Sequence, residues 1–208
     1  GYAFLDVPGA RIGFVDVPGH ERLVHTMLAG ATGIDHALLL VAADDGVMPQ
    51  TVEHLAVLSL LGLSRGAIVI TKTDRVDGAR LAQVREQVDA LRQGSSLHEA
   101  PLLAVSALSG GGLDALRAHL AAAALDQPRR ARAEDGFRLA VDRAFSLSGA
   151  GTVVTGTVHA GEVSVGDELV LVPGDATRRH RVRSLHAQNR AADRARAGER
   201  CALALLGL

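Results

Sequence analysis

The chain has 208 residues, of which 48% are hydrophobic and only 2% aromatic, and its formal net charge is −1. That length can bury one sizeable core and part of a second. The single cysteine, Cys201, excludes an internal disulfide framework and a zinc site built from several cysteines. The longest apolar run, residues 37–43, is far shorter than the ~20 residues of a membrane-spanning helix. We therefore expect a cytoplasmic protein with no membrane partner.

Charge is distributed unevenly along the chain. Residues 1–125 carry 9 Lys and Arg against 13 Asp and Glu, whereas residues 126–208 carry 13 against 10. Eight arginines lie within residues 178–200, where the only acidic residues are Asp193 and Glu199. Such a stretch suits a surface that faces RNA phosphates, and it equally suits a set of solvated surface arginines. The charge pattern alone leaves both interpretations open.

The first part of the chain has the pattern of an α/β fold. From residue 11 to about residue 124, apolar strands alternate with segments of helical periodicity. The continuous apolar run at 37–43 is typical of a buried parallel strand. The tetrapeptide at 6–9, DVPG, lies between two strand-like runs and is expected to be a hairpin tip. Strands are predicted at 11–15, 37–43, 66–70 and 102–105, and helices at 50–61, around 81–91 and at 113–124.

The second part of the chain has a different residue pattern. Residues 126–136 show no periodicity and are predicted to form a linker. Residues 137–208 consist of short β-rich runs separated by glycine turns, which predicts a small antiparallel barrel, incomplete at residue 208. The runs fall at 137–145, 152–159, 168–173 and 178–185. The predicted architecture is therefore a doubly wound α/β domain over residues 1–125, whose N-terminal part is expected to be missing, followed by a partial antiparallel β-barrel.

The sequence Asp16-Val17-Pro18-Gly19-His20 is a DxxG element followed by histidine. In such an element the aspartate reaches a water on a nucleotide-bound Mg²⁺, and the glycine amide contacts the terminal phosphate. The glycine is required because a Cβ would obstruct that close approach. Aspartate is also a common helix N-cap, but the Pro-Gly-His that follows favours the phosphate-binding interpretation.

A second element, Thr71-Lys72-Thr73-Asp74, has the spacing of a guanine-binding motif. The two oxygens of Asp74 can accept from guanine N1–H and the exocyclic amine, whereas adenine would leave the carboxylate unpaired. Lys72 would lay its stem along the base, and Thr71 replaces the commoner asparagine. Further along, Ser106-Ala107-Leu108 would support the guanine O6 through a backbone amide. Together, in this order, these elements predict a GTP-binding domain.

The loop that holds the phosphates in such domains is missing from the sequence. No G-x-x-x-x-G-K-[ST] occurs anywhere, although that loop supplies the backbone amides and the lysine that bind the β-phosphate. The chain also opens inside a predicted strand without an initiator methionine. We therefore expect an interior fragment of a longer protein, which by itself binds GTP very weakly and does not hydrolyse it.

The motifs resemble those of the translational GTPases of the elongation factor Tu group. The segment VAADDGVMPQTVEH at 41–54 is similar to theirs almost residue for residue. The resemblance implies GTP and GDP as ligands, Mg²⁺ bound by Asp16 through water, and His20 as the catalytic residue that orients the hydrolytic water.

Several segments resemble one branch of that group, the bacterial selenocysteine-specific elongation factors. They are VDRAF at 141–145, SGAGTVVTGT at 148–157, LHAQN at 185–189 and GIDHALLLV at 33–41, together with Thr71. The resemblance implies that Asp142, Arg143 and Arg200 line the aminoacyl pocket. A selenol is acidic enough to be anionic at neutral pH, so guanidinium groups would favour it over serine through charge-assisted contacts. Asp142 would need Arg143 to neutralise it, and a surface Asp-Arg pair is the alternative interpretation.

The resemblance also implies the partners: selenocysteinyl-tRNA, the ribosome and, through missing C-terminal domains, an mRNA hairpin. We expect a monomer. Two alternatives stay open at this point. A general aminoacyl-tRNA carrier of the elongation factor Tu type would share every GTP motif, and a non-catalytic fragment or paralogue would act only as a binding module.

Overall fold

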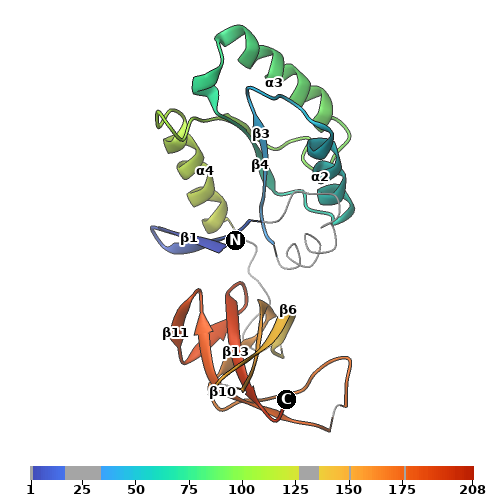
Figure 1. Cartoon of the computed structure of the whole chain (residues 1–208), viewed down its shortest axis with the longest axis vertical. Coiled ribbons are helices and arrows are strands. Elements are labelled where there is room, and N and C mark those ends of the chain that lie inside the picture. Colours follow the sequence, from blue (N-terminus) through green and yellow to red (C-terminus); the bar gives the residue numbers. More distant parts are fainter. Residues whose placement is uncertain (1, 17–33, 127–135, 150, 176) are drawn as a thin grey trace.

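The structure is a computed structural model that describes residues 2–16, 34–126, 136–149, 151–175 and 177–208. An α/β part comes first in the chain and a β part follows (Figure 1). The elements of the α/β part are β1 (Tyr2–Val7), β2 (Ala10–Val15), β3 (Ala37–Ala42), α2 (Pro49–Leu60), β4 (Gly66–Thr71), a 3₁₀ turn (Thr73–Arg75), α3 (Gly78–Arg92), β5 (Leu102–Ala104) and α4 (Leu113–Leu125).

A parallel sheet in the order β3-β4-β5 forms the centre of the α/β part. One face packs on α2 and α3 through residues such as Leu55 and Val84, and the other packs on α4 through Leu116. Because both faces are covered, the strands are apolar throughout; β4 is buried from Gly66 to Ile70. The predicted α/β architecture is confirmed. The predicted strand and helix ends lie within one residue of the observed ones, except that α3 begins at Gly78 rather than near residue 81.

The DVPG tetrapeptide at 6–9 is a hairpin tip, as predicted. β1 and β2 pair in antiparallel register with Val7 opposite Ala10, and Gly9 adopts a φ of 81°, which glycine tolerates at no steric cost. Within the described residues β2 pairs only with β1 and not with the β3-β4-β5 sheet. The hairpin lies beside α4, where a Cβ on Gly9 would meet the Leu125 side chain at 3.4 Å.

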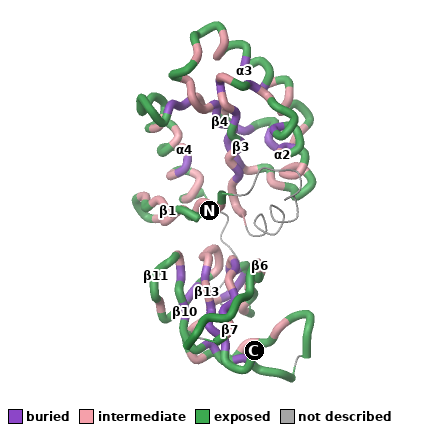
Figure 2. The backbone as a smooth tube through the Cα atoms, viewed as in Figure 1, coloured by how far each residue is buried: buried purple, intermediate pink, exposed green. Residues whose placement is uncertain are grey.

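The β part is a curled antiparallel sheet in the order β11-β10-β13-β7-β6, with β9 added to β10 and a separate pair β8-β12. Its concave face holds a core of aliphatic side chains, and β7 and β10 alternate between buried and exposed positions (Figure 2). The strands are β6 (Arg138–Leu147), β7 (Gly151–Ala160), β8 (Glu162–Ser164), β9 (Glu168–Leu169), β10 (His180–Ala187), β11 (Arg190–Ala192), β12 (Arg194–Arg196) and β13 (Arg200–Leu206).

One predicted strand is shorter than expected. Of the run at 168–173, only Glu168–Leu169 pairs as a strand. Pro173 has no N–H to donate to a ladder, and Val172 beside it is 87% exposed, so this end of the run has neither hydrogen bonds nor a core to hold it in a sheet.

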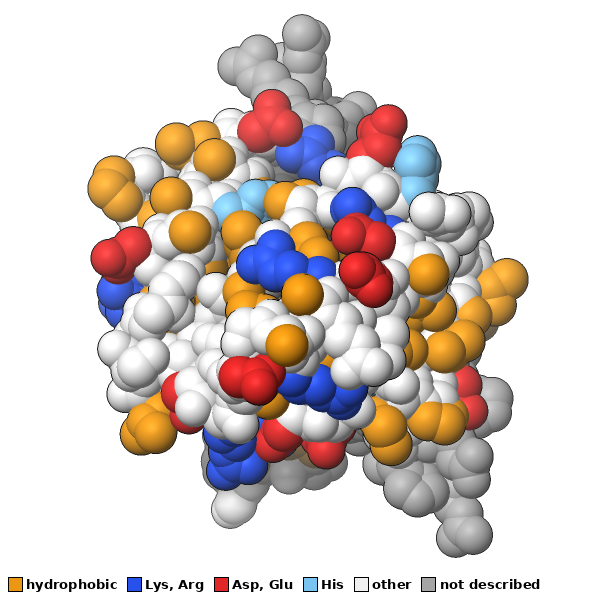
Figure 3. All heavy atoms as spheres, turned by 90° about the horizontal axis from the view of Figure 1, so that it is seen from above, with side chains coloured by type: hydrophobic (Ala, Val, Ile, Leu, Met, Phe, Trp, Pro, Cys, Tyr) orange, Lys and Arg blue, Asp and Glu red, His pale blue; other side chains and the backbone are white. Residues whose placement is uncertain are grey.

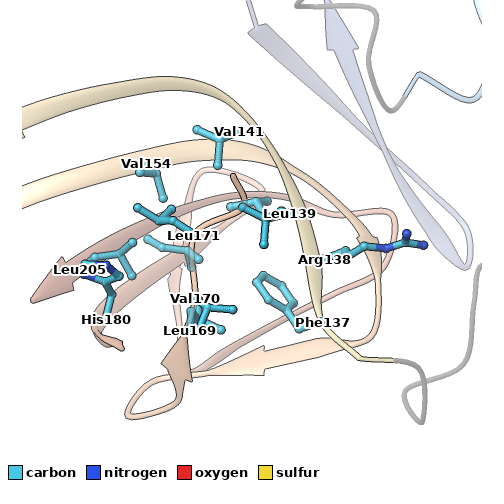
Figure 4. Close-up of a pocket in the computed structure, with 12 residues that line it drawn as sticks. Phe137, Arg138, Leu139, Val141, Val154, Leu169, Val170, Leu171, His180 and Leu205 are labelled. Atoms are coloured by element: carbon cyan, nitrogen blue, oxygen red, sulfur yellow. The ribbon is translucent and has the colours of Figure 1, made fainter. Parts of the chain in front are cut away.

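An open cavity of about 150 Å³ lies on the inner side of the curled sheet (Figure 4). Its wall is mostly apolar, with Phe137, Leu139 and Leu205 among the lining residues, and Arg138 and His180 supply its ionisable groups. It lacks the several convergent polar groups that nucleotide sites require. Among the described residues, no helix is both long and apolar enough to cross a membrane.

Candidate functional site

The guanine motif lies at the C-terminal edge of the parallel sheet. Thr71 ends β4, Lys72 adopts a left-handed backbone with φ of 55°, and Asp74 follows in the 3₁₀ turn. Ser106, only 1% exposed, comes directly after β5 and its hydroxyl donates a hydrogen bond to Asp74 Oδ1. The Thr73 amide donates to the Val105 carbonyl at 3.3 Å and ties the two loops together. The structure thus brings together the two predicted elements and fixes the orientation of Asp74.

The loop after β5 is closed by hydrogen bonds of its own backbone amides. The Ser106 amide donates to the Gly111 carbonyl at 2.9 Å, and the Ser109 amide donates to the Ser106 hydroxyl at 3.0 Å. Among the described residues, neither the Ala107 amide nor the Leu108 amide donates a hydrogen bond to a protein acceptor. The turn requires Gly112, because a Cβ there would lie 2.0 Å from the Ala104 carbonyl oxygen. Leu108, the third residue of the motif, is exposed.

Two acidic residues that the sequence reasoning did not single out lie beside Lys72. Asp44 and Asp45 follow β3 at the same sheet edge, and Lys72 Nζ is 3.2 Å from Asp44 Oδ1 and 3.6 Å from Asp45 Oδ2. Arg75 Nη1 also reaches Asp44, at 3.0 Å. Desolvation opposes ionisation of Asp44, but hydrogen bonds from Arg75 and Lys72 outweigh it, so its pKa lies below the ordinary value. The sequence feature that could have identified these two acidic residues is their position just after a predicted buried parallel strand.

The phosphate-binding element is described only at its start. β2 ends at Val15, and Asp16 follows as an exposed residue at the strand's C-terminus. A carboxylate at a strand end suits Mg²⁺, which prefers oxygen ligands and retains several waters. The predicted residues Val17, Pro18, Gly19 and His20 lie outside the described residues.

Two of the three predicted aminoacyl residues, Asp142 and Arg200, contact each other on the sheet of the β part. Val141 pairs with Gly156 and Arg143 with Thr155, so Asp142 is the extra residue of a β-bulge. From the bulge, Asp142 forms two hydrogen bonds with the Arg200 guanidinium, at 2.5 and 2.9 Å, and accepts a third from the Thr155 hydroxyl at 2.8 Å. The paired side chains are 9% and 19% exposed, respectively. The bulge therefore creates a largely buried, doubly hydrogen-bonded ion pair.

The expectation that Arg143 neutralises Asp142 was wrong, because Arg200 from β13 does so. Arg143 is exposed on β6 and has no ion pair with any residue that the structure describes. Burial opposes the charge of Arg200, but the hydrogen bonds and charge of Asp142 prevail and raise its pKa. The site thus presents a compensated pair beside a cation without a described counter-charge.

Tyr2 covers the same ion pair and was not found from the sequence. The guanidinium carbon of Arg200 lies 4.2 Å from the centre of the Tyr2 ring, a cation–π arrangement between the β1-β2 hairpin and β13. Asp6 of the hairpin is also 3.7 Å from Arg190 Nη2. The hairpin therefore contacts the β part at the predicted aminoacyl residues.

The arginine-rich stretch 178–200 is largely occupied by local partners. Arg194 and Arg196 pair with Glu162, while Arg178 and Arg183 donate to backbone carbonyls. These contacts favour the surface-arginine interpretation for most of the stretch. Figure 3 shows the end of the molecule formed by the α/β part, where basic and acidic side chains of the described residues are interspersed.

Comparison with known proteins gives concordant matches. Residues 3–126 match the elongation factor Tu GTP-binding domain family, and residues 151–208 match elongation factor Tu domain 2. The chain is 51% identical over its whole length to the selenocysteine-specific elongation factor of Escherichia coli and 47% identical to that of Desulfomicrobium baculatum. It spans only 33% and 32% of those two proteins.

Solved structures agree with the sequence matches. Translation elongation factor SelB of Methanococcus maripaludis, in complex with the GTP analogue GPPNHP, superposes with a TM-score of 0.89 at 32% identity. A bacterial selenocysteine-specific elongation factor, EF-Sec, gives a TM-score of 0.88 at 34% identity. Both matches cover the whole of this chain, and 46% and 35% of those chains, respectively.

Proposed function

Because this chain belongs to the elongation factor Tu family of GTP-binding proteins, we propose that it is the GTP-dependent part of a factor that delivers selenocysteinyl-tRNA to the ribosome. GTP hydrolysis is the switch between its states. The similarity to selenocysteine-specific elongation factors over the whole chain supports this cargo over a general aminoacyl-tRNA. The protein works in the cytoplasm as a monomer, and an mRNA hairpin is bound by parts outside these 208 residues.

The observation that carries the nucleotide assignment is the hydrogen bond from the buried Ser106 hydroxyl to Asp74. It leaves Oδ2 and one lone pair of Oδ1 to accept from guanine N1–H and the exocyclic amine. The Ala107 amide donates to O6. Thr71 and Leu108 flank these contacts on the two loops. Adenine would leave the Asp74 carboxylate unpaired, so the site selects GTP and GDP.

The catalytic side of the proposal rests on the DxxG-His element. Mg²⁺, when bound with the nucleotide, neutralises charge on the phosphates. Asp16 would hold the ion through water, and the Gly19 amide, which follows Val17 and Pro18 in the sequence, would bind the terminal phosphate. His20 orients the attacking water. Without a phosphate loop, residues 1–208 alone do not hydrolyse GTP.

The cargo assignment rests on the charges around Asp142. The Asp142 carboxylate and the Tyr2 ring hold Arg200 in place, so the Arg200 guanidinium is pre-organised. Arg143 follows Asp142 in the sequence and has no counter-charge among the described residues. It supplies the net positive charge that an anionic selenolate requires. Neutral serine gains much less from the same groups.

The nucleotide assignment is tested by Asp74→Asn in the full-length protein. The substitution replaces an acceptor by a donor, which suits the C2 carbonyl of xanthine and opposes the amine of guanine. We expect the preference to change from GTP to XTP in a competition assay. Asp114→Asn is the matched control, since its side chain is fully exposed on α4, and it should leave the preference unchanged. An unaltered GTP-to-XTP ratio for Asp74→Asn would remove that residue from the guanine site.

A further inference from the structure

We infer that Asp44 is a positioning residue of the guanine site, which acts by holding Lys72 in its base-binding orientation. The inference rests on the proposed function, because it concerns how the same site retains its nucleotide. It assigns a role to the turn after β3, which carries none of the guanine motif.

The turn reaches the guanine loop because β3 and β4 are parallel neighbours. Ala42 lies opposite Thr71 in the register, so the residues after each strand emerge side by side at one edge of the sheet. The turn is itself closed by a hydrogen bond from the Gly46 amide to the Ala42 carbonyl, at 2.8 Å. Arg80 of α3 donates to the Asp44 carbonyl at 3.1 Å. These two hydrogen bonds hold the backbone around Asp44 in place independently of Lys72.

Lys72 needs such a partner. Its left-handed backbone conformation is uncommon for a residue with a side chain, and its side chain is 43% exposed on a flexible four-carbon stem. Both oxygens of Asp44 lie within reach of Nζ, at 3.2 and 3.4 Å. An ammonium held at its far end keeps the stem in one orientation, so less freedom is lost when a base packs against it.

Asp44 is better placed for this role than Asp45. The Asp44 side chain is 26% exposed and the Asp45 side chain 59%, and Asp45 lies further from Nζ, at 3.6 Å. Asp44 also binds Arg75 on the far side of the guanine loop. One carboxylate thus connects to the loop at two points that flank Asp74.

The test is a double-mutant cycle on nucleotide release from the full-length protein. The dissociation rate of a fluorescent N-methylanthraniloyl GDP is measured by stopped flow for wild type, Asp44→Asn, Lys72→Met and the double variant. Asp44→Asn should release GDP about 3- to 5-fold faster, the range of a partly exposed ion pair. In the Lys72→Met background, the same substitution should change the rate less than about 1.5-fold, since little coupling remains. Asp114→Asn, whose side chain is fully exposed in the first turn of α4 and contacts Arg117 rather than the guanine loop, should release GDP at the wild-type rate.

An equal effect of Asp44→Asn in both backgrounds would overturn the inference, because Asp44 would then act on the fold or through Arg75 alone. An unchanged rate in the single variant would overturn it as well. Failure of the wild type to bind the GDP probe is a different result, since it would contradict the proposed function itself.

Discussion

Replacing Asp142 by alanine removes the counter-charge of Arg200 from a site where the two side chains are only 9% and 19% exposed. Breaking a fully buried pair by removing one partner costs about 3–5 kcal/mol, chiefly because the other charge stays desolvated. Arg200 retains some solvent and its contact with the Tyr2 ring, so a loss of about 2–3 kcal/mol is expected here. Asp142→Asn, which keeps the shape and one acceptor, should cost less.

The assay is urea unfolding of the 208-residue chain, followed by far-UV circular dichroism. The matched control is Glu162→Gln, which breaks the contact of Glu162 with Arg196, where the side chains are 26% and 63% exposed. Because water screens that pair, the control should unfold at nearly the wild-type urea concentration. Equal losses for Asp142→Ala and Glu162→Gln would refute the reasoning, because burial would then make no difference between the two pairs.

Two further predictions follow from titratable groups. Burial raises the pKa of the Cys201 thiol to about 12 from an ordinary value near 9, so the folded chain should react with a disulfide reagent far more slowly than the urea-unfolded chain. The free energy of unfolding that this group contributes should fall as pH rises above 9 towards 12. Rapid labelling of the folded protein would contradict the burial of this thiol. Desolvation, His119 and Arg65 lower the pKa of His36 below 6.5, so its neutral form favours folding and the free energy of unfolding falls as pH falls below 6.5. His36→Asn should flatten the dependence of the unfolding free energy on pH in this acid range, and an unchanged slope would contradict the prediction.

The sequence predicted where the residues of the guanine motif lie in the fold, because these residues follow strands closely in the chain. Asp74 and Ser106 come after two neighbouring parallel strands, and strand ends of a parallel sheet share one edge. The hairpin at 6–9 was predictable for a similar local reason, since Pro-Gly between strand-like runs fixes a turn. Features that depend only on residues adjacent in the chain were therefore predictable from the sequence pattern.

The partners of charged residues were not predictable in the same way. Sequence placed Arg143 next to Asp142, but the bulge at Asp142 turns its carboxylate towards Arg200, which comes from a strand much later in the chain. Tyr2 reaches that arginine from the other part of the protein. Asp44 meets Lys72 only through the register of β3 and β4. These contacts depend on tertiary geometry, which no local pattern specifies.

Specificity for selenocysteine is tested most directly by comparing the binding of selenocysteinyl-tRNA and seryl-tRNA to the GTP-bound full-length protein. The tRNA body and the ester contribute equally to both, so the difference isolates the charge. Wild type should bind selenocysteinyl-tRNA more tightly, and Arg143→Ala or Arg200→Ala should weaken that binding about 10- to 150-fold, the loss of one charge-assisted contact. Seryl-tRNA binding should change much less. Equal losses for both tRNAs would mean that the arginines contact RNA phosphate, and would contradict a selenocysteine-specific carrier.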